Sequence, residues 1–219
     1  MKKIWIPLVL LAVMMGVTGC MINRTSFQEE AVSYMEEKYD ESFTWIEPVD
    51  GQLGSSRKRG YVSSSNFPGE KILVEGDRGE KETFRDNYVA YLQNAEACQE
   101  LQTIASAVDE NWKAFCSPEE IGLSLGKEAS ALEYLQNGAC LTSLFVPREG
   151  WLEARDTKME EFRRVLWEKG ISANITVYTL PAGELSSLTR DTYSGYTNSS
   201  GAGRFVMDRE GNFAVSKWR

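Results

Sequence analysis

Four cysteines and no histidine define the side-chain chemistry open to this 219-residue chain. The lack of histidine excludes Ser-His-Asp and Cys-His catalysis, histidine metal sites and imidazole pH switching. A zinc site would have to rely on cysteine or carboxylate ligands alone. The cysteines at positions 20, 98, 116 and 140 are therefore the first residues to consider.

Cys20 ends an N-terminal segment that has the three parts of an export signal. Lys2 and Lys3 give a basic start, residues 4–19 are uncharged and mostly aliphatic, and small residues lead into the cysteine. The basic end of such a segment stays on the cytoplasmic side while the apolar part enters the bilayer. We therefore expect residues 1–19 to be a signal peptide and the rest of the chain to be exported.

The segment Val17-Thr18-Gly19-Cys20 resembles the lipobox of bacterial lipoproteins, which consists of an aliphatic residue, two small residues and a cysteine. The resemblance implies that a diacylglycerol is attached to the thiol of Cys20 and that the Gly19–Cys20 bond is cleaved. A two-chain lipid suits this role, because a single acyl chain holds a protein on a membrane only marginally. The implied location is the cell membrane, with the lipid-anchored chain facing outside the cytoplasm.

Two other interpretations of this segment are a transmembrane anchor and an ordinary secretory signal. A transmembrane anchor needs about 20 apolar residues and seldom ends in such a box. A secretory signal could precede a cysteine by coincidence. Position 21 is Met, not the Asp that marks inner-membrane retention in many Gram-negative lipoproteins.

Cys98, Cys116 and Cys140 share none of the sequence context of Cys20. They are separated by 17 and 23 residues and form no C-x-x-C pair. One interpretation is a single disulfide with one thiol left over, as an exported protein permits. The other, which we favour, is three buried thiols that act as small apolar side chains. No cofactor or metal is predicted.

Acidic side chains are the remaining candidates for catalysis. Asp156 with Glu160, or Glu160 with Glu161, could act as a glycosidase pair, but that chemistry needs two carboxylates about 5–9.5 Å apart across a cleft. Neighbours on one helix do not predict such an arrangement.

Two glycine-containing segments could hold an ion, and we interpret both as connections. Asp208 to Asn212 lacks the alternating oxygen ligands and distant glutamate of a calcium loop, so we expect a hairpin turn there. Gly201 to Arg204 could hold an anion on backbone amides, but a phosphate loop would be followed by a helix, whereas a strand is expected here. We therefore predict a flexible connector.

Aromatic residues could form a carbohydrate- or peptide-binding surface. The candidates are Trp45, Tyr61, Trp112, Trp151 and Tyr193. We expect core packing to account for most of them, because large aromatic side chains dominate the energetics of cores.

The charge balance argues against nucleic acid as a partner. The chain has 32 acidic and 24 basic residues, and loss of Lys2 and Lys3 would leave 22 basic residues and a net charge of −10. A nucleic-acid-binding domain is expected to carry a basic face. The chain also lacks the basic cluster that would hold it flat on anionic lipid. Its 42% hydrophobic and 11% aromatic content indicates a folded region.

Hydrophobic periodicity in residues 26–109 predicts a helix, three antiparallel strands and a second helix. The first helix opens at Ser26, which forms a capping-box pattern with Glu29. The second is capped by Asp86 and ends near Val108. The strands lie at 43–47, 61–62 and 71–75, and the first is stopped by Pro48.

Residues 110–219 repeat a rough order of strands and helices. We expect strands at 112–116, 140–146 and 171–180, a helical turn from Ser117, a short helix opened by Ser130 and Glu133, and a long helix over 151–169 with Leu152 on its core face. A mobile loop at 189–203 precedes a closing hairpin at 204–215. The fold class is α+β, with antiparallel sheets packed with helices in two similar helix-plus-meander halves, 26–109 and 110–219, after a lipidated tether at 20–25. The alternative is one continuous domain.

The opening helix, the meander and Asp86-Asn87-Tyr88 look loosely similar to small uncharacterised lipoproteins of Gram-positive gut bacteria. That resemblance brings no activity with it. With an anchor and no recognisable catalytic set, we expect a non-catalytic binding or accessory module of the cell envelope, whose partner is an envelope protein or a ligand. The alternative is a histidine-free, carboxylate-dependent hydrolase at the cell surface.

Overall fold

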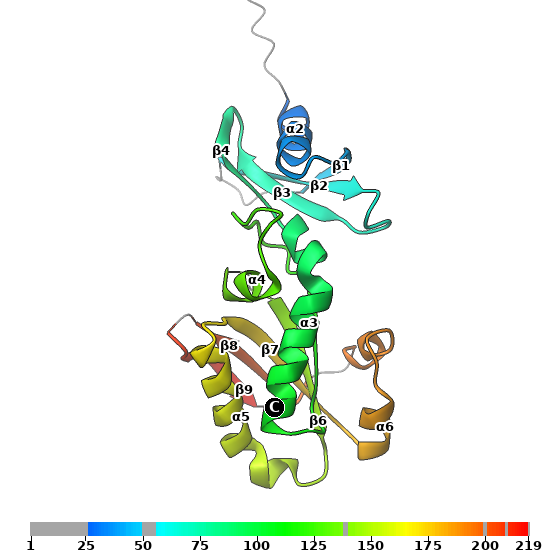
Figure 1. Cartoon of the computed structure of the whole chain (residues 1–219), viewed down its shortest axis with the longest axis vertical. Coiled ribbons are helices and arrows are strands. Elements are labelled where there is room, and N and C mark those ends of the chain that lie inside the picture. The colour runs from blue at the N-terminus through cyan, green and yellow to red at the C-terminus, as the bar shows by residue number, and fades with distance from the viewer. Residues whose placement is uncertain (1–25, 50–55, 138–139, 199–200, 209, 219) are drawn as a thin grey trace, which may run out of the picture.

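The computed structural model describes residues 26–49, 56–137, 140–198, 201–208 and 210–218, which form an α+β fold of two lobes stacked along the long axis (Figure 1). The upper lobe, residues 26–86, contains α2 (Phe27–Tyr39) and a four-stranded sheet. The lower lobe, residues 88–218, contains a five-stranded sheet with helices on it. Each lobe has its own cluster of buried apolar side chains.

The upper sheet is an antiparallel meander of β1 (Phe43–Val49), β2 (Lys58–Ser64), β3 (Ile72–Asp77) and β4 (Glu80–Asp86). The prediction of three strands missed β4, in which Phe84 is the one apolar residue. Pro48 does not stop the first strand, because it lies inside β1 and pairs with Gly60 of β2. Proline is tolerated there because β1 lies at the sheet edge, where one side of the backbone needs no partner.

Helix α2 covers this meander and begins as predicted. The backbone amide of Ser26 donates to Glu29 Oε2 at 2.8 Å, and the Glu29 amide donates to Ser26 Oγ at 3.3 Å, which completes the capping box. Ala31, Met35 and Tyr39 are buried against the sheet, since they recur at helical spacing on one side.

Asp86 joins the upper lobe to the helix that follows it. It is the last residue of β4, and Asn87 rather than Asp86 is the N-cap residue of α3 (Tyr88–Val108). Its backbone also pairs with Leu123 of the lower lobe through two hydrogen bonds, of 3.3 and 2.7 Å. The side chain of Asn87 accepts from the Leu73 amide at 2.8 Å and donates to the Glu119 carbonyl at 3.0 Å. Residues 86 and 87 therefore connect the two lobes.

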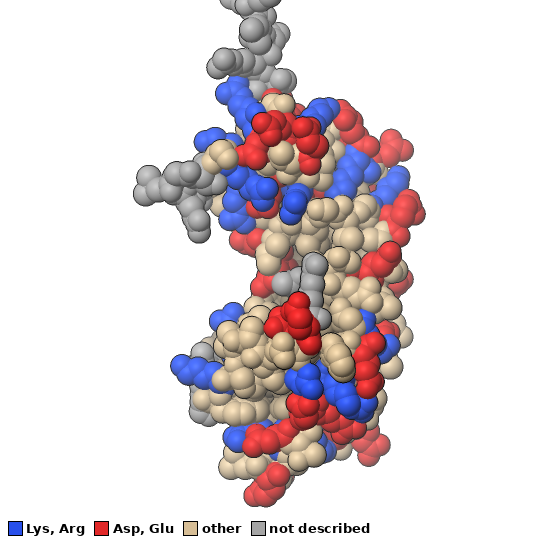
Figure 2. Space-filling model, turned by 90° about the vertical axis from the view of Figure 1, so that its left-hand side faces the viewer, with Lys and Arg blue, Asp and Glu red and all other residues tan. Residues whose placement is uncertain are grey.

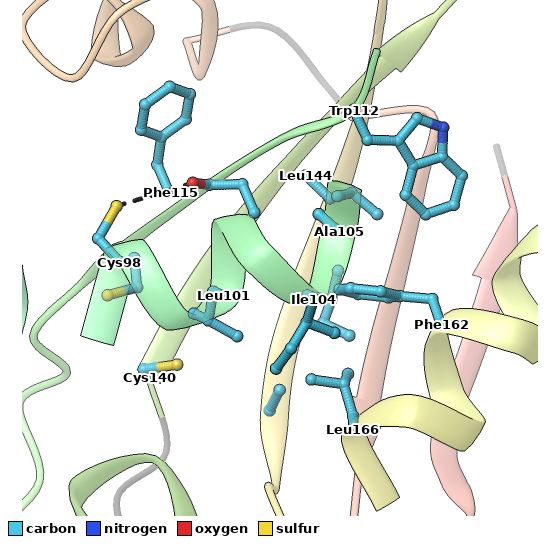
Figure 3. Close-up of a cluster of buried hydrophobic side chains, with 14 of the residues drawn as sticks. Cys98, Leu101, Ile104, Ala105, Trp112, Phe115, Cys140, Leu144, Phe162 and Leu166 are labelled. Carbon is cyan, nitrogen blue, oxygen red and sulfur yellow. Dashed lines mark hydrogen bonds between the residues drawn. The ribbon is translucent and has the colours of Figure 1, made fainter. Parts of the chain in front are cut away.

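Helix α3 buries most of its apolar face in the lower lobe, although the sequence division placed it in the first half. Val89, Leu101 and Ile104 belong to the lower cluster, whereas Tyr88 belongs to the upper one. In Figure 3, Leu101, Ile104 and Ala105 on α3 face Phe162 and Leu166 on α5 (Trp151–Glu168), with Leu144 of the sheet beside them. This layer of side chains is the centre of the lower core.

The lower sheet has the order β5 (Lys113–Ser117), β6 (Cys140–Pro147), β7 (Ala173–Leu180), β8 (Gly203–Met207) and β9 (Phe213–Trp218). All its neighbouring strands are antiparallel except β6 and β7. A parallel pair needs a crossover connection, and α5 supplies it. The two lobes therefore differ in topology, since the upper sheet is a simple meander.

Helices lie on both faces of the lower sheet. Helices α3 and α5 lie on one side, whereas α6 (Ala182–Ser187) lies on the other (Figure 1). The short helix α4 (Ala131–Asn137) opens with the predicted Ser130 and Glu133 capping box. The predicted helical turn from Ser117 is wrong, because that residue ends β5 and an irregular connection follows.

The segment predicted as a mobile loop at 189–203 is in part ordered structure. It contains a 3-10 helix, η1 (Tyr193–Tyr196), and its last residue, Gly203, opens β8. The Tyr193 ring stacks on Phe115 with centroids 4.5 Å apart and planes within 7°. This aromatic contact helps to hold a mostly polar segment against the sheet. The polar composition of the segment gives no sign of such a contact.

Candidate functional site

The residues for which the sequence predicts a chemical role, Gly19 and Cys20, lie outside the described part of the chain. So does the predicted signal peptide. No helix among the residues that are described is long and apolar enough to cross a membrane.

A recess of about 250 Å³, here called the arginine recess, opens at one end of the lower sheet. It is lined by Arg148, Trp151, Leu152, Arg155, Thr179, Ala202 and Trp218. These residues come from the connection after β6, the first turns of α5, the end of β7, the segment just before β8, and the end of β9. The carboxyl ends of parallel strands are where α/β sheets usually bind ligands, because connections diverge there and leave a crevice.

Two tryptophans form the aromatic wall of the arginine recess. Trp151 is buried, and its ring lies edge-on to Trp218 with centroids 5.7 Å apart. Trp218 in turn lies against Gly203, where an added Cβ would come within 2.4 Å of the indole. Gly203 was predicted to belong to a flexible connector. It is needed here because the Trp218 side chain leaves no room for a Cβ at this position.

Two guanidinium groups give the arginine recess its charge. The Arg155 guanidinium lies 4.7 Å from the Trp218 ring centroid and hydrogen-bonds to Asp156 at 2.8 Å. This bond raises the pKa of Arg155 above its ordinary value, so the group stays charged. Arg148 is exposed and, within the described residues, has no carboxylate at ion-pair distance. No Asp or Glu is among the described residues that line the recess.

Leu152 is the exposed apolar residue of the arginine recess. The sequence pattern placed it on the core face of α5, but its side chain is 74% exposed. The core face is formed instead by Trp151, Met159, Phe162 and Leu166. Because folding buries little of the apolar surface of Leu152, that surface is available to contact a ligand.

A second recess, here called the larger recess, lies at the same end of the sheet and has a volume of about 410 Å³. Its lining residues are Glu110, Asn111, Lys113, Pro147, Glu149, Ala182, Leu185 and Ser186. The turn after β6 separates the two recesses, because Arg148 lines one and Glu149 lines the other. This end of the molecule thus offers one cationic and one mixed-charge hollow.

The acidic pairs considered from the sequence do not line either recess. Asp156 pairs with Arg155, and Glu160 pairs with Arg163 at 2.6 Å, so both carboxylates are engaged on the exposed side of α5. The space-filling view shows such mixing of charges, with acidic and basic side chains adjacent in the upper and lower parts of the visible face and mostly uncharged surface between them (Figure 2). Neighbouring carboxylates on this surface are balanced locally by cations.

The three cysteines after Cys20 are free and buried in the lower core, as we favoured. Cys98 lies on α3, Cys116 on β5 and Cys140 at the start of β6. Hydrogen bonds with the thiols of Cys140 and Cys98, together with burial, raise the pKa of Cys116 and keep it protonated. Nowhere in the described ranges does a group of three or more Cys, Asp or Glu side chains suit a metal ion.

The other predicted sites have structural roles. Asp208 Oδ1 accepts from the Asn212 amide at 2.8 Å, which closes the β8–β9 turn as predicted. Trp112 and Trp151 are buried, while Trp45, Tyr61 and Tyr193 are half-buried. Core packing therefore explains most of the aromatic candidates, and Trp151 both packs in the core and lines the arginine recess.

The arginine recess was not predicted as a site from the sequence. A local signal exists, since Arg148, Trp151 and Arg155 fall at the start of a helix and recur at three- and four-residue spacing. Trp218 lies more than sixty residues away along the chain and carries no such signal. Only the pairing of β9 with β8 brings it to the recess.

Comparison with known proteins gives one distant structural likeness. No protein-family model matches the chain, and no curated protein matches it. A solved structure of a DUF5037 family protein from the gut bacterium Ruminococcus gnavus is similar at 12% identity and a TM-score of 0.36. The match covers 87% of this chain and 93% of that one. A likeness this distant transfers no site residue.

Proposed function

We propose that this protein is a lipid-anchored binding module of the cell envelope, held by a diacylglycerol on Cys20 and presenting its ligand site at the end away from the membrane. The placement of the two recesses carries the proposal. Helix α2 lies at one end of the long axis, and the start of α5 and α6 lie at the other (Figure 1). Both recesses are built at that second end.

The tether geometry and the charge support this orientation. Ser26 begins the folded part only six residues after Cys20. Six residues span at most about 20 Å when extended, so the upper lobe stays close to the anchor. The acidic net charge repels an anionic bilayer surface, which favours a lobe that stands off it. A partner would therefore meet the lower lobe first.

The anchor is tested by replacing Cys20 with Ala and following incorporation of a labelled fatty acid. The expected result is loss of label and accumulation of uncleaved precursor, because the acceptor thiol is gone. Cys98→Ala is the matched control and should label normally, since that thiol is buried in the lower core. Full labelling of the Cys20→Ala variant would remove the proposed anchor.

The binding role is tested by crosslinking intact cells and recovering the protein from detergent-solubilised membranes. The expected result is a specific partner or ligand that is crosslinked through the lower lobe. Crosslinkers placed on exposed positions of α2 serve as the comparison, because α2 lies at the opposite end. Recovery of no specific partner under several conditions would contradict the proposal.

One observation favours a second candidate, a carboxylate-dependent hydrolase. Glu110 and Glu149 both line the larger recess, and glycosidases act through two such carboxylates. Hydrolysis of any glycoside in a substrate panel, abolished by Glu110→Gln and by Glu149→Gln but not by Glu153→Gln, would establish this candidate. Full activity in both recess variants would eliminate it.

A further inference from the structure

We infer that the arginine recess binds the C-terminal residue of a peptide, with the terminal carboxylate on Arg148 and an apolar side chain against Trp151, Leu152 and Trp218. This deepens the proposed function by naming the ligand class of its site. The inference rests on the charge, the size and the hydrogen-bonding character of the residues that line the recess.

The charge of the recess selects an anion. Arg148 and Arg155 are its ionisable lining residues, and Arg148 has no ion-pair partner among the described residues. A guanidinium presents a planar fork of donors that matches the two oxygens of a carboxylate. In a chain with a net charge of −8, two arginines that line one hollow, with no acid among its described lining residues, form a local exception.

The walls of the recess select an apolar group beside the anion. Trp151 and Trp218 supply aromatic surface, and Leu152 is 74% exposed. Burying that leucine against a ligand side chain would remove apolar surface from water, which is favourable in proportion to the area. The volume of about 250 Å³ is below the roughly 300–1,000 Å³ of pockets for drug-sized ligands. A single residue is therefore a suitable occupant.

The hydrogen-bonding groups distinguish a peptide end from a sugar or a free amino acid. Among the described lining residues there is no Asp, Glu, Asn or Gln side chain, and Thr179 supplies the one hydroxyl. These side chains offer the several hydroxyls of an acidic sugar a single acceptor, and they offer the ammonium of a free amino acid no carboxylate. A peptide C-terminus has a carboxylate but no adjacent ammonium, so the cationic lining matches its charge.

The experiment uses the lipidated protein in nanodiscs, with empty nanodiscs as the blank. The probes are N-acetyl-L-phenylalanine, its C-terminal amide, free L-phenylalanine and glucuronate, titrated while tryptophan fluorescence is recorded. The expected result is saturable binding of the N-acetylated acid, with the amide and the free amino acid at least about tenfold weaker. Loss of hydrogen bonds to a charged group is worth about tenfold or more in affinity.

Substitutions at Arg148 and at a control position test whether the N-acetylated acid binds in the arginine recess. Arg148→Gln should weaken binding of the N-acetylated acid about tenfold or more, and Arg148→Lys should restore part of it, since the charge remains but the fork is lost. Arg164→Gln is the control, because Arg164 lies on α5 outside the lining of the recess, in an exposed pair with Glu168. Thermal unfolding of each variant shows whether the fold is kept.

Several outcomes would overturn the inference. Equal binding of acid and amide removes the role of the carboxylate, and an unchanged affinity in Arg148→Gln removes the site. Tighter binding of free phenylalanine or of glucuronate assigns the recess to a different ligand class. Absence of binding by every probe, together with a partner recovered by crosslinking through the lower lobe, would sink this inference and leave the proposed binding role standing.

Discussion

At the scale of single residues, Asp86 illustrates how a fully buried carboxylate is stabilised. Burying such a charge is costly unless its oxygens are hydrogen-bonded. Its Oδ2 accepts from Tyr34 Oη at 2.9 Å and Lys38 Nζ at 2.7 Å. Its Oδ1 accepts from Tyr39 Oη at 2.7 Å and from the Tyr88 amide at 2.9 Å. One side chain therefore connects α2, β4 and the start of α3.

Replacing Asp86 with Asn should destabilise the fold strongly. The change leaves the Lys38 ammonium without its anionic partner in a largely buried position. Removing one member of a buried pair costs about 3–5 kcal/mol, measured as the free energy of unfolding in urea. Glu37→Gln is the control, because the Glu37–Lys81 pair is exposed on both sides. Equal stability of the two variants would contradict a structural role for Asp86.

Residues with local context could be predicted from the sequence, and residues with distant partners could not. The Ser26 and Glu29 cap depends on two positions one helical turn apart, so its pattern is visible along the chain. Asp86 was interpreted as a helix cap because Tyr34 and Lys38, its partners, are about fifty residues earlier. Only the folded β4 brings Asp86 to α2.

At the scale of elements, α2 is attached to its sheet through tyrosine hydroxyls. Burial, followed by the nearby charge of Asp86, raises the pKa of Tyr34 and of Tyr39 well above 10.0. Burial also raises the pKa of Tyr91, on α3, to about 12. A raised pKa means that folding favours the protonated phenol. The stability contributed by these tyrosines is therefore complete below pH 10 and falls as the pH rises above it.

The protein should accordingly lose stability at alkaline pH. Unfolding free energies measured in urea from neutral pH upward should decline above pH 10, the ordinary pKa of tyrosine. Tyr34→Phe should be less stable at neutral pH, because it loses the bond to Asp86, but its decline above pH 10 should be shallower. An identical alkaline slope in this variant would show that Tyr34 does not couple folding to pH.

Gly203 of β8 leaves the space that the Trp218 side chain occupies beside the recess. Gly203→Ala should destabilise the protein by about 1–3 kcal/mol, as overpacking does, because the new Cβ would meet Trp218 at 2.4 Å and Phe205 at 3.0 Å. Gly183→Ala in α6, where no atom lies within 4 Å of the added Cβ, should not destabilise. Differential scanning calorimetry of both variants checks the prediction, and equal melting temperatures would refute it.

Elements with a clear pattern of apolar residues were predicted, and the strand that lacks such a pattern, β4, was not. The span of α5 is within one residue of its prediction, since aromatic and aliphatic residues mark its core face. Strand β4 was missed because Phe84 is the single apolar residue in a run of charged ones. Pairing with β3 makes β4 a strand, and such pairing does not appear in a local pattern.

At the scale of the whole molecule, two cores of different topology meet at residues 86 and 87. The upper core is closed by neighbouring strands of a meander. The lower core needs a crossover helix. It also includes α3, which precedes the first strand of the lower sheet in the sequence. The hydrophobic periodicity of the helices and strands sufficed to predict the α+β class. It did not specify the β6–β7 pair, which is parallel because the crossover through α5 joins its two strands.

The position of Trp218 in the last strand has a consequence for the order of synthesis and folding. The meander nearest the proposed anchor is complete once residue 86 has emerged, and it can fold early because its contacts are local. The arginine recess requires β9 to pair with β8, which involves residue 218. A chain cut short before that residue could retain the proposed anchor and the upper lobe while lacking the proposed binding site. If the proposed function holds, such a fragment would compete with the full-length chain for its place on the membrane without binding the ligand.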